Sequence, residues 1–544
     1  MHLRLSALGA AAMLSAIACA QPAAPATTGP AAAGSTPKAG GQLSTAINAD
    51  PWDWDLSYTG KSVPNGDAMG LAYSSLLAYD VRPAVAYNDF VLKPKLAERW
   101  EVSPDAKSFT FYLRKGVKFA NAAPVNGREV VASDVKWSYE YANRSGQFQD
   151  KKLPAGAFNW MFEGLDSVDT PDPYKVVIRF TSPFSPFIKY TASDWNPVLP
   201  KEIYDQYGDF KEHIVGSGPF VLDTQASQKG SRWVWKKNPT YFEPGKPYLD
   251  EVRWLVIPDV STARAAFVTK QVDWLSKDWV DSAFATKELP GKVPNAVVSK
   301  FNYPAGGWIS FNVKKAPFNV PQFRQAFMMG IDRDAISSAV FGGVEPWALT
   351  GAYQGLFTQE ETKALAKYDP EGAKKLLAQA GLANGVDMDF EITGNNNPVQ
   401  ELMQAQLKKV GINIKLVPTE RAEYSSMRKG HKYNTQWVQW ACASQLDDED
   451  TQLYGCYYST SAYNDGGVQD PVLDKLILAQ RAEADESKRR ELQRDAVRRL
   501  TEMAWAGSLF YPTQFEAWQP ALKNYAVHAA SRTSQPWHEV WLDK

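Results

Sequence analysis

Residues 386–417, VDMDFEITGNNNPVQELMQAQLKKVGINIKLV, hold the pattern that decides the fold class. The pattern predicts a strand over residues 386–393, a helix over residues 398–410 and a second strand over residues 412–417. The helix is predicted from apolar residues that share one face: Val399, Leu402, Met403, Leu407 and Val410. A strand, a helix and a strand in this order predict a crossover between two parallel strands. The second half of the chain is therefore expected to contain parallel sheet, in an α/β fold.

Strands and helices are also predicted over the rest of the chain. Strands are expected over residues 42–47, 175–180, 220–222, 251–258 and 308–313, with a hairpin over residues 101–117. Residues 92–100 are expected to be helix-like or irregular. Helices are expected after Ser133-Asp134, over residues 261–275 with Ser261 as the cap, over residues 320–341 with a break at Gly330 and a restart at Asp332, from Asp369-Pro370 to Gly381, and as one long tract from Asp470-Pro471 through Leu500. Gly216 and Gly218 predict a close backbone approach or a hinge with positive φ.

Composition limits the classes of function. At 544 residues the chain is expected to form two or three subdomains. Its 44% hydrophobic and 22% charged residues are ordinary for a globular protein, and a formal net charge of -1 gives no field that favours nucleic acid. The 19 Trp, 24 Tyr and 25 Phe exceed what a core of this size requires. Most of these rings are expected to pack in the core, and some to line a binding surface.

Residues 1–41 predict export and a membrane anchor. A basic start at Arg4 and an apolar run over residues 5–17 are typical of a secretory signal, because the run is too short to span a bilayer. Residues 16–19, AIAC, resemble a bacterial lipobox, although Ala16 replaces the usual leucine. Residues 1–18 are thus a predicted lipoprotein signal peptide, Cys19 the lipidated residue, and residues 19–39 a disordered tether. An ordinary cleaved signal with a chance cysteine is the alternative. The mature protein is expected in the cell envelope or periplasm, lipid-anchored to the outer face of the cytoplasmic membrane.

Residues 437–450, WVQWACASQLDDED, form the predicted centre of the functional site. Two tryptophans, a cysteine and four carboxylates follow the strand-helix-strand pattern closely, where an α/β chain tends to reach its ligand crevice. We expect Trp440 and its neighbours to form one wall of a cleft for a small solute. The carboxylates of residues 447–450 lack the alternation of a Ca²⁺ loop, so a solvated acidic turn is expected. The arginines of residues 489–498 are likewise expected to be solvated.

Cys442 and Cys456 are the remaining cysteines. In an exported protein they predict a disulfide that closes a loop of about 15 residues, worth roughly 3 kcal/mol by chain entropy. Two buried free thiols are the alternative.

Several stretches in order along residues 40–544 carry a resemblance to a known family. They are LAYSSLLAYD, LKPKLAERWEVSPDAKSFTFYLRKGVKF, the helix at Asp134-Val135, VGSGPF, KNPTYFEPGKPYLDEVRW, FNVKKAPFNVPQFRQAFMMGIDRDAI, YDPEGAKKLLAQAGL, LKKVGINIKL and DPVLDKLI. One piece alone is weak, but their joint order is specific. The chain resembles the large solute-binding proteins of bacterial ABC importers, the family 5 class with dipeptide-, oligopeptide- and nickel-binding members.

The resemblance implies a two-lobed periplasmic-binding-protein-like fold of type II, cluster C, with hinge crossovers and an inserted subdomain. Lobe I would comprise residues 40–87, 214–303 and 520–544. The inserted subdomain would comprise residues 88–213, and lobe II residues 304–519. The solute would be enclosed as the lobes close.

The resemblance also implies site residues. Trp440 and Trp308 correspond to cleft aromatics of the family, and Ala443 stands where peptide-binding members have an aspartate for the ligand's α-amine. An alanine cannot neutralise an ammonium, so a peptide terminus would have to meet Asp447 or Asp448. Oligosaccharides are the alternative ligand, because indole faces stack on sugar rings while hydroxyls could bond to Gln439, Asn312 or Ser444. The other predicted contacts are Trp437, Trp52, Trp54, Ser217 and Tyr511, with core packing as the alternative for Trp52 and Trp54.

The predicted function is that of a solute-binding lipoprotein, not an enzyme, that delivers an oligopeptide-like solute to the permease of an ABC importer. An oligosaccharide-binding member and a ligand-presenting sensor are the alternatives. The sensor stays open because import and sensing both need only ligand-driven closure. A secreted hydrolase is remote, since the sequence has no GxSxG, HExxH or P-loop motif. No metal or cofactor is expected, because no ligand spacing connects His213, His431, His528 and His538. We expect a monomer that binds no nucleic acid and meets the membrane only through its lipid anchor.

Overall fold

The computed structural model describes residues 36–544 except residues 52, 56–62, 154–158, 304–307, 344, 354, 394–396, 421–422, 424–425, 428–430, 434, 439–447, 462 and 533–535. Residues 38–544 form one compact unit, separate from residues 1–37. The predicted signal peptide, Cys19 and most of the predicted tether lie outside the described residues. Within the described part of the chain, no helix combines the length and the apolar composition needed to cross a bilayer.

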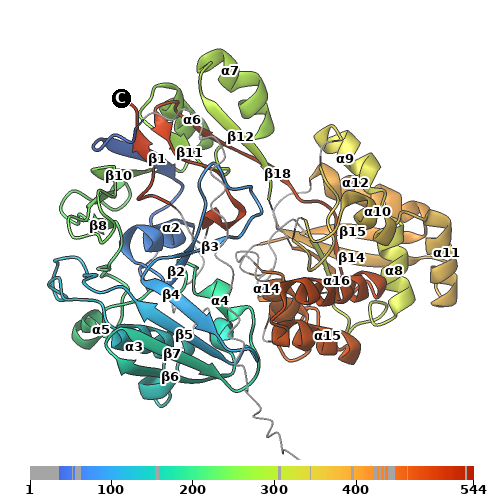
Figure 1. Cartoon of the computed structure of the whole chain (residues 1–544). Coiled ribbons are helices and arrows are strands. Elements are labelled where there is room, and N and C mark those ends of the chain that lie inside the picture. Colours follow the sequence, from blue (N-terminus) through green and yellow to red (C-terminus); the bar gives the residue numbers. More distant parts are fainter. Residues whose placement is uncertain are drawn as a thin grey trace, which may run out of the picture. The chain divides into compact units, whose positions relative to one another are not determined.

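A seven-stranded mixed sheet gathers strands from both ends of the chain (Figure 1). Its order is β12-β18-β11-β1-β10-β9-β8, and β1 is parallel to both β10 and β11. The blue β1, the green β10 and the red β18 of Figure 1 come from distant parts of the sequence. The strands are β1 (Gln42–Ile47), β8 (Phe220–Leu222), β9 (Arg232–Lys237), β10 (Glu251–Val256), β11 (Trp274–Leu275), β12 (Val297–Asn302) and β18 (Thr513–Trp518). The strands predicted from residues 42, 220 and 251 are confirmed.

A five-stranded sheet of order β15-β14-β16-β13-β17 contains the predicted crossover. β14 (Val386–Thr393) and β15 (Ile412–Thr419) pair in parallel, and α12 (Pro398–Lys409) connects them. α12 begins with a capping box, because the side chains of Asn397 and Gln400 each accept from the other's amide. The strand-helix-strand prediction is therefore confirmed. The other strands of this sheet are β13 (Trp308–Phe311), β16 (Thr435–Val438) and β17 (Ala506–Ser508).

An antiparallel sheet of order β4-β5-β7-β6 lies within the predicted insert. β4 (Ala97–Val102) and β5 (Ser108–Leu113) form the predicted hairpin, and β7 (Lys175–Phe180) pairs with β5 and with β6 (Leu165–Asp172). The helix-like or irregular structure predicted for residues 92–100 is wrong, since β3 (Leu92–Pro94) pairs with β2 (Leu77–Tyr79) and β4 follows. β3 is too short, and β4 too exposed, to show an apolar alternation. The last pair is β19 (Leu522–Lys523) with β20 (Trp541–Leu542).

Several helix boundaries are confirmed. α8 (Pro321–Met329) ends at Gly330, and α9 (Arg333–Phe341) restarts after Asp332, whose side chain accepts from the amide of Ala335. Asp369 caps α11 (Pro370–Gln379) in the same way, through the amide of Gly372. An aspartate one residue before the first turn satisfies an otherwise unpaired amide, which is why the helices begin there.

Three helix predictions need correction. α6 (Val260–Val268) is capped by Asp259 rather than Ser261 and ends well before residue 275. α3 (Ala132–Asn143) begins directly after Val131, whose amide donates to Asp134, so Asp134 lies inside the first turn. The long tract from Asp470 is two helices, α15 (Pro471–Ala482) and α16 (Glu486–Glu502), because Asp485 caps the second.

The remaining helices are short. The α-helices are α2 (Val63–Ala72), α4 (Phe187–Tyr190), α5 (Lys201–Tyr207), α7 (Leu289–Lys292), α10 (Gln359–Leu365) and α14 (Asp450–Gln452). The 3₁₀ and π segments are η1 (Gly146–Phe148), η2 (Asn159–Phe162), η3 (Phe284–Glu288), η4 (Leu453–Tyr457) and η5 (Ala529–Arg532).

Gly216 and Gly218 provide a close backbone approach rather than a hinge with positive φ. A Cβ at Gly216 would lie 2.2 Å from the carbonyl oxygen of Ala72, and one at Gly218 would lie 2.4 Å from that of Leu71. The amide of Gly218 donates to the Ala72 carbonyl at 2.8 Å. The C-terminus of α2 is therefore held against the segment that leads into β8.

Two segments connect the two large sheets. One lies between β12 and β13, and the other between β17 and β18. The amide of Tyr303 in the first segment donates to the carbonyl of Pro512 in the second at 2.9 Å, and beside it the Asn302 side chain at the end of β12 donates to Thr513 at the start of β18 at 3.0 Å. The predicted lobe boundaries stay a prediction, because residues 38–544 form one unit. β18 lies within the range predicted for lobe II, yet it pairs with β11 and β12 of the seven-stranded sheet.

Candidate functional site

The carboxyl ends of three parallel strands define one edge of the five-stranded sheet. β14, β15 and β16 run in the same direction, so Thr393, Thr419 and Val438 end at this edge. β13 is antiparallel to β16 and begins at the same edge, where Trp308 pairs with Val438. β17 also ends there, because Ser508 pairs with Trp308. In open α/β sheets, ligands bind outside the carboxyl ends of the parallel strands.

Two predicted contact residues belong to the strands at this edge. Trp308 begins β13, and Trp437 lies in β16 in register with Ile309. In the pairing of β13 with β16, Trp308 and Trp437 therefore occupy adjacent pairs of residues rather than the same pair. Gln439 and Trp440 follow β16 directly in the sequence. They lie outside the described residues, as do Trp52, Ser444 and Asp447.

Asn312 lies at the other edge of the sheet. β13 is antiparallel to β16, so its carboxyl end lies beside the amino end of β16. The Asn312 side-chain amide donates to the carbonyls of His431 and Tyr433, each at 2.8 Å. The fold thus uses this buried amide to hold a neighbouring segment. We therefore leave Asn312 out of the candidate site.

Three other predicted contacts are buried in the fold. Trp54 packs edge-on against Trp233 and Trp235, with ring centroids 5.4 and 5.8 Å away, which is the core-packing alternative. Ser217 is completely buried between Gly216 and Gly218. Tyr511 lies on the segment between β17 and β18, and its hydroxyl donates to the carbonyl of Ala352 at 2.9 Å. We leave these three residues out of the candidate site as well.

A cavity of about 70 Å³ lies at the carboxyl ends of the parallel strands β1, β10 and β11. Aromatic side chains form much of its wall: Trp254, Trp274, Trp279, Phe301 and Tyr303. Lys277 and Asp278, which also line it, form an ion pair at 2.7 Å. The sequence did not indicate Trp274 or Trp279, because β11 has two residues and a helix was predicted through residue 275. The available signal was the polar Ser-Lys-Asp turn between the two tryptophans.

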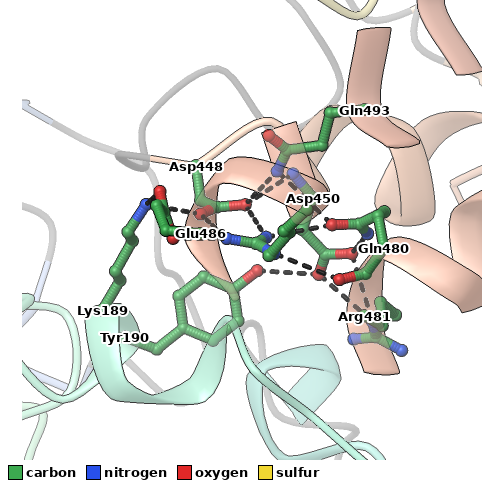
Figure 2. A network of polar contacts seen from close by, with 9 residues as sticks. Lys189, Tyr190, Asp448, Asp450, Gln480, Arg481, Glu486 and Gln493 are labelled. Atoms are coloured by element: carbon green, nitrogen blue, oxygen red, sulfur yellow. Dashed lines mark hydrogen bonds and ion pairs between the residues drawn. The ribbon is translucent and has the colours of Figure 1, made fainter. Parts of the chain in front are cut away.

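Asp448 lies in a buried ion-pair network rather than in a solvated turn (Figure 2). Both carboxylate oxygens accept from the Arg489 guanidinium, one at 2.7 Å, and Lys189 Nζ lies 3.0 Å away. Burial alone would raise the pKa of Asp448, but Arg489 and Lys189 hold that pKa well below its usual range. The solvated acidic turn is therefore wrong for Asp448, and the solvated arginine face is wrong for Arg489. A ligand amine would have to compete with Arg489 and Lys189 for this carboxylate.

Asp450 extends the network to a second element (Figure 2). Its buried carboxylate accepts from the hydroxyl of Tyr190 at 3.0 Å and from the amide of Gln480, and Arg481 Nε lies 3.2 Å away. The amide of Ser185 also donates to the carbonyl of Arg481, at 2.8 Å. The network therefore joins α4 of the predicted insert to α14 and α15 of the predicted lobe II, directly after the stretch with Trp440.

Cys456 is disulfide-bonded. Its predicted partner, Cys442, lies outside the described residues, so the pairing stays a prediction.

One cluster of possible metal ligands occurs among the described residues, which the sequence did not indicate. Potential ligand atoms of Glu243, His538 and Glu539 lie within 4.8 Å of one another. Lys246 Nζ lies 2.9 Å from a carboxylate oxygen of each glutamate. An ammonium therefore already compensates the charge that would attract a metal ion. Burial lowers the pKa of His538 to about 4, although Glu243 and Glu539 oppose that shift.

Comparisons with known proteins identify the family of the chain. Residues 91–464 match the model of the bacterial extracellular solute-binding proteins, family 5. The chain belongs to this family. The family 5 chain is 29% identical over 509 residues to the dipeptide-binding protein of Escherichia coli K12, which covers 87% of this chain and 92% of that protein. It is 29% identical over 364 residues, 62% of this chain and 64% of that protein, to heme-binding protein A of Haemophilus influenzae.

A solved structure extends the likeness to the fold. The periplasmic binding protein DppA of Helicobacter pylori, in complex with the peptide STSA, superposes with a TM-score of 0.75 at 26% identity, covering 93% of this chain and 99% of that one. This family 5 protein therefore has the predicted two-lobed α/β fold with hinge crossovers and an insert. Its family is one of solute-binding proteins rather than enzymes.

Proposed function

We propose that this family 5 protein captures a short peptide between its lobes and delivers it to the permease of an ABC importer. The observation that carries the proposal is the sheet edge where β13 begins with Trp308 and where β16, with Trp437, ends just before Gln439 and Trp440. The peptide is supported by the dipeptide-binding relative and by the peptide complex of the structural neighbour.

The crossover segments support a closing motion. Both large sheets present the carboxyl ends of parallel strands, and two hydrogen-bonded segments connect them. A bend at Tyr303 and Pro512 would change the angle between the sheets while the hydrogen bond between the segments persists. The aromatic wall near β11 would then supply the opposite face of the cleft.

In this proposal the α-amine of the peptide is not bound by the aspartate that peptide-binding members of the family have. Ala443 offers no carboxylate, and Asp448 is already paired with Arg489 and Lys189. Of the predicted acids, Asp447 remains as the partner for an α-amine. If Asp447 does not reach the ligand, a neutral solute becomes the better occupant, because indole faces stack on apolar faces of sugar rings without an ion pair. An oligosaccharide is therefore the second candidate.

Native mass spectrometry of the purified protein tests the solute class directly. A co-purified ligand released under mild conditions is expected to have the mass of a short peptide, whereas a mass series of hexoses would favour the oligosaccharide. The same ligand is then titrated back and recovered. Recovery of a cleaved ligand would replace the proposal with a hydrolase, and binding without uptake by the host would favour a sensor.

Trp440→Ala tests the wall of the cleft. Loss of a tryptophan at a binding centre costs about 2 kcal/mol, so the affinity for the released ligand should fall roughly 30-fold. Trp100→Ala is the control, since Trp100 lies on β4 in the antiparallel sheet and should leave the affinity unchanged. Equal affinities of the two variants in a calorimetric titration would remove Trp440 from the site.

A lipid anchor on Cys19, a flexible tether and a monomeric body complete the proposal. Intact-mass analysis of the membrane fraction should find a diacylglycerol on Cys19. Cys19→Ser should release the protein from the membrane with its ligand affinity intact.

A further inference from the structure

A pocket of about 300 Å³ lies beside β17, an edge strand of the five-stranded sheet. Residues of α8, α9, α11, the end of α16 and β17 line it. The wall is largely apolar, with Met328, Met329, Leu349, Leu376 and Ala506 among the lining residues. Leu365 and Lys367 stand at its exposed rim. A mostly apolar wall with few polar groups is typical of small-molecule sites.

One charged side chain of this wall is buried. Arg333 is 2% exposed, and it donates through Nη1 to the carbonyl of Ala366 at 3.0 Å and through Nη2 to that of Ser508 at 3.3 Å. Among the described residues, its Nε has no hydrogen-bond partner. In the described part of the chain no carboxylate acts on Arg333, and desolvation alone lowers its pKa to about 10. The two carbonyls and the Trp347 ring, whose centroid lies 5.2 Å from the guanidinium carbon, compensate only part of the cost of burying this cation.

Arg324 provides an internal comparison. It is also buried, but Nε, Nη1 and Nη2 each donate to a main-chain carbonyl, at 3.1, 2.6 and 3.0 Å. Arg324 does not line the pocket, and its hydrogen bonds suit a purely structural role. Arg333 differs on both counts, because it lines a cavity and keeps an unsatisfied donor.

We infer that this pocket is a second ligand site, which binds a small carboxylate with an apolar body. The carboxylate would pair with Arg333, and the body would lie against Met328 and Met329. A guanidinium suits a carboxylate, since charge-assisted N–H···O bonds are the strong ones. A cavity of about 150 Å³ binds benzene, so about 300 Å³ accommodates a body of roughly eight carbons. Glu502 also lines the pocket, but its side chain is 69% exposed and its carboxylate lies 3.7 Å from Arg499.

Octanoate is the probe, and 1-octanol is its neutral counterpart. The chain has 10 Met residues, so methionine-methyl NMR gives few resonances, and Met328→Leu and Met329→Leu assign the two in the pocket. Octanoate is expected to shift those two resonances saturably, and 1-octanol to bind at least tenfold more weakly. The full-length protein serves for all titrations.

Two variants test the named contacts. Arg333→Gln should weaken octanoate binding at least tenfold while leaving 1-octanol unchanged. Leu365→Trp, at the exposed rim, should obstruct both probes. Trp440→Ala should leave octanoate binding intact, which separates this pocket from the proposed peptide cleft. The inference is overturned if octanoate does not shift the pocket methyls, if it shifts them no better than 1-octanol, or if a folded Arg333→Gln binds it equally. Should Arg333→Gln fail to fold, the two probes compared on the unaltered protein and on Leu365→Trp decide.

Discussion

Removing the charge of Asp448 should destabilise the protein strongly, although it changes only one atom of the side chain. Arg489 and Lys189 now face two carboxylate oxygens. In Asp448→Asn they would face one neutral carbonyl oxygen and one NH₂ group, which cannot accept their hydrogen bonds. The Asp448 side chain has no exposed surface, and those of Arg489 and Lys189 are 3% and 19% exposed. Both cations would therefore keep their burial and lose their shared anion.

The magnitude follows from the burial and the contacts. Breaking a buried ion pair by removing one partner costs about 3–5 kcal/mol, because the other charge stays desolvated. Asp448 also accepts from the amide of Asp450 at 2.9 Å and from Gln493 at 3.3 Å. These neutral donors remain after the substitution and can bond to the new carbonyl oxygen. We therefore expect a loss of about 3–4 kcal/mol, a large part of the roughly 5–15 kcal/mol that stabilises a domain.

Urea unfolding of the purified protein measures this loss as a change in midpoint at constant slope. Glu486→Gln is the matched control, since Glu486 lies 3.2 Å from Lys189 but its side chain is 73% exposed. It should cost less than about 1 kcal/mol. Adding Arg489→Met to Asp448→Asn should recover stability, because it removes one orphaned charge. A loss below about 1 kcal/mol for Asp448→Asn would refute the view that these charges depend on one another.

Two further predictions concern a titrating group and a close contact. Burial lowers the pKa of His538 to about 4 from a usual value of 6.5, so between these pH values the unfolded chain binds the proton more readily than the folded protein. The unfolding free energy should therefore fall by about 3 kcal/mol as the pH decreases from 6.5 to 4. This part of the pH dependence should be absent in His538→Gln. Gly218→Ala should lower the unfolding midpoint by the equivalent of about 1–3 kcal/mol, because the added Cβ would lie 2.4 Å from the carbonyl oxygen of Leu71. Gly291→Ala in α7 is the control, since a Cβ there would meet no described atom within 4 Å and the change should be neutral or slightly stabilising. Equal midpoints for the two alanine variants, or an unchanged pH profile in His538→Gln, would contradict the respective argument.

The parts of the fold that could be predicted are those encoded by neighbouring residues. The crossover through α12 is evident because its apolar face, its capping box and its two flanking strands all lie within residues 386–419. β11 could not be predicted in this way. Trp274 and Leu275 form a strand because β1 and β18 pair on its two sides, and those partners come from the two ends of the chain. Two residues have no periodicity to detect.

The candidate site also combines features encoded by neighbouring residues with features that depend on distant ones. Trp437 was predicted from its place soon after the crossover and Trp308 from the family resemblance, whereas the pairing of β13 with β16, which brings both positions to one end of the sheet, was not predicted. The burial of Asp448 depends on Arg489, 41 residues away, and the contact of Asp450 with Tyr190 spans 260 residues. A run of acids has the same local appearance whether it is solvated or paired. Its environment is decided by α4 and α16, whose positions are set by the tertiary fold.

The buried network around Asp448 could connect ligand binding with contact between the lobes. Residues 439–447 join two anchored points, since β16 is held by its pairing with β13 and Asp448 is held by Arg489 and Lys189. Lys189 and Tyr190 belong to the predicted insert, whereas the acids and Arg489 belong to the predicted lobe II. A ligand that engages Trp440 therefore acts on a segment whose far end is bonded across the two parts. If the network forms only when the lobes close, Asp448→Asn should weaken ligand binding and stability together. If it persists in the open state, the substitution should lower stability alone and leave the affinity unchanged, so measuring both quantities on one variant distinguishes a closing contact from a permanent one.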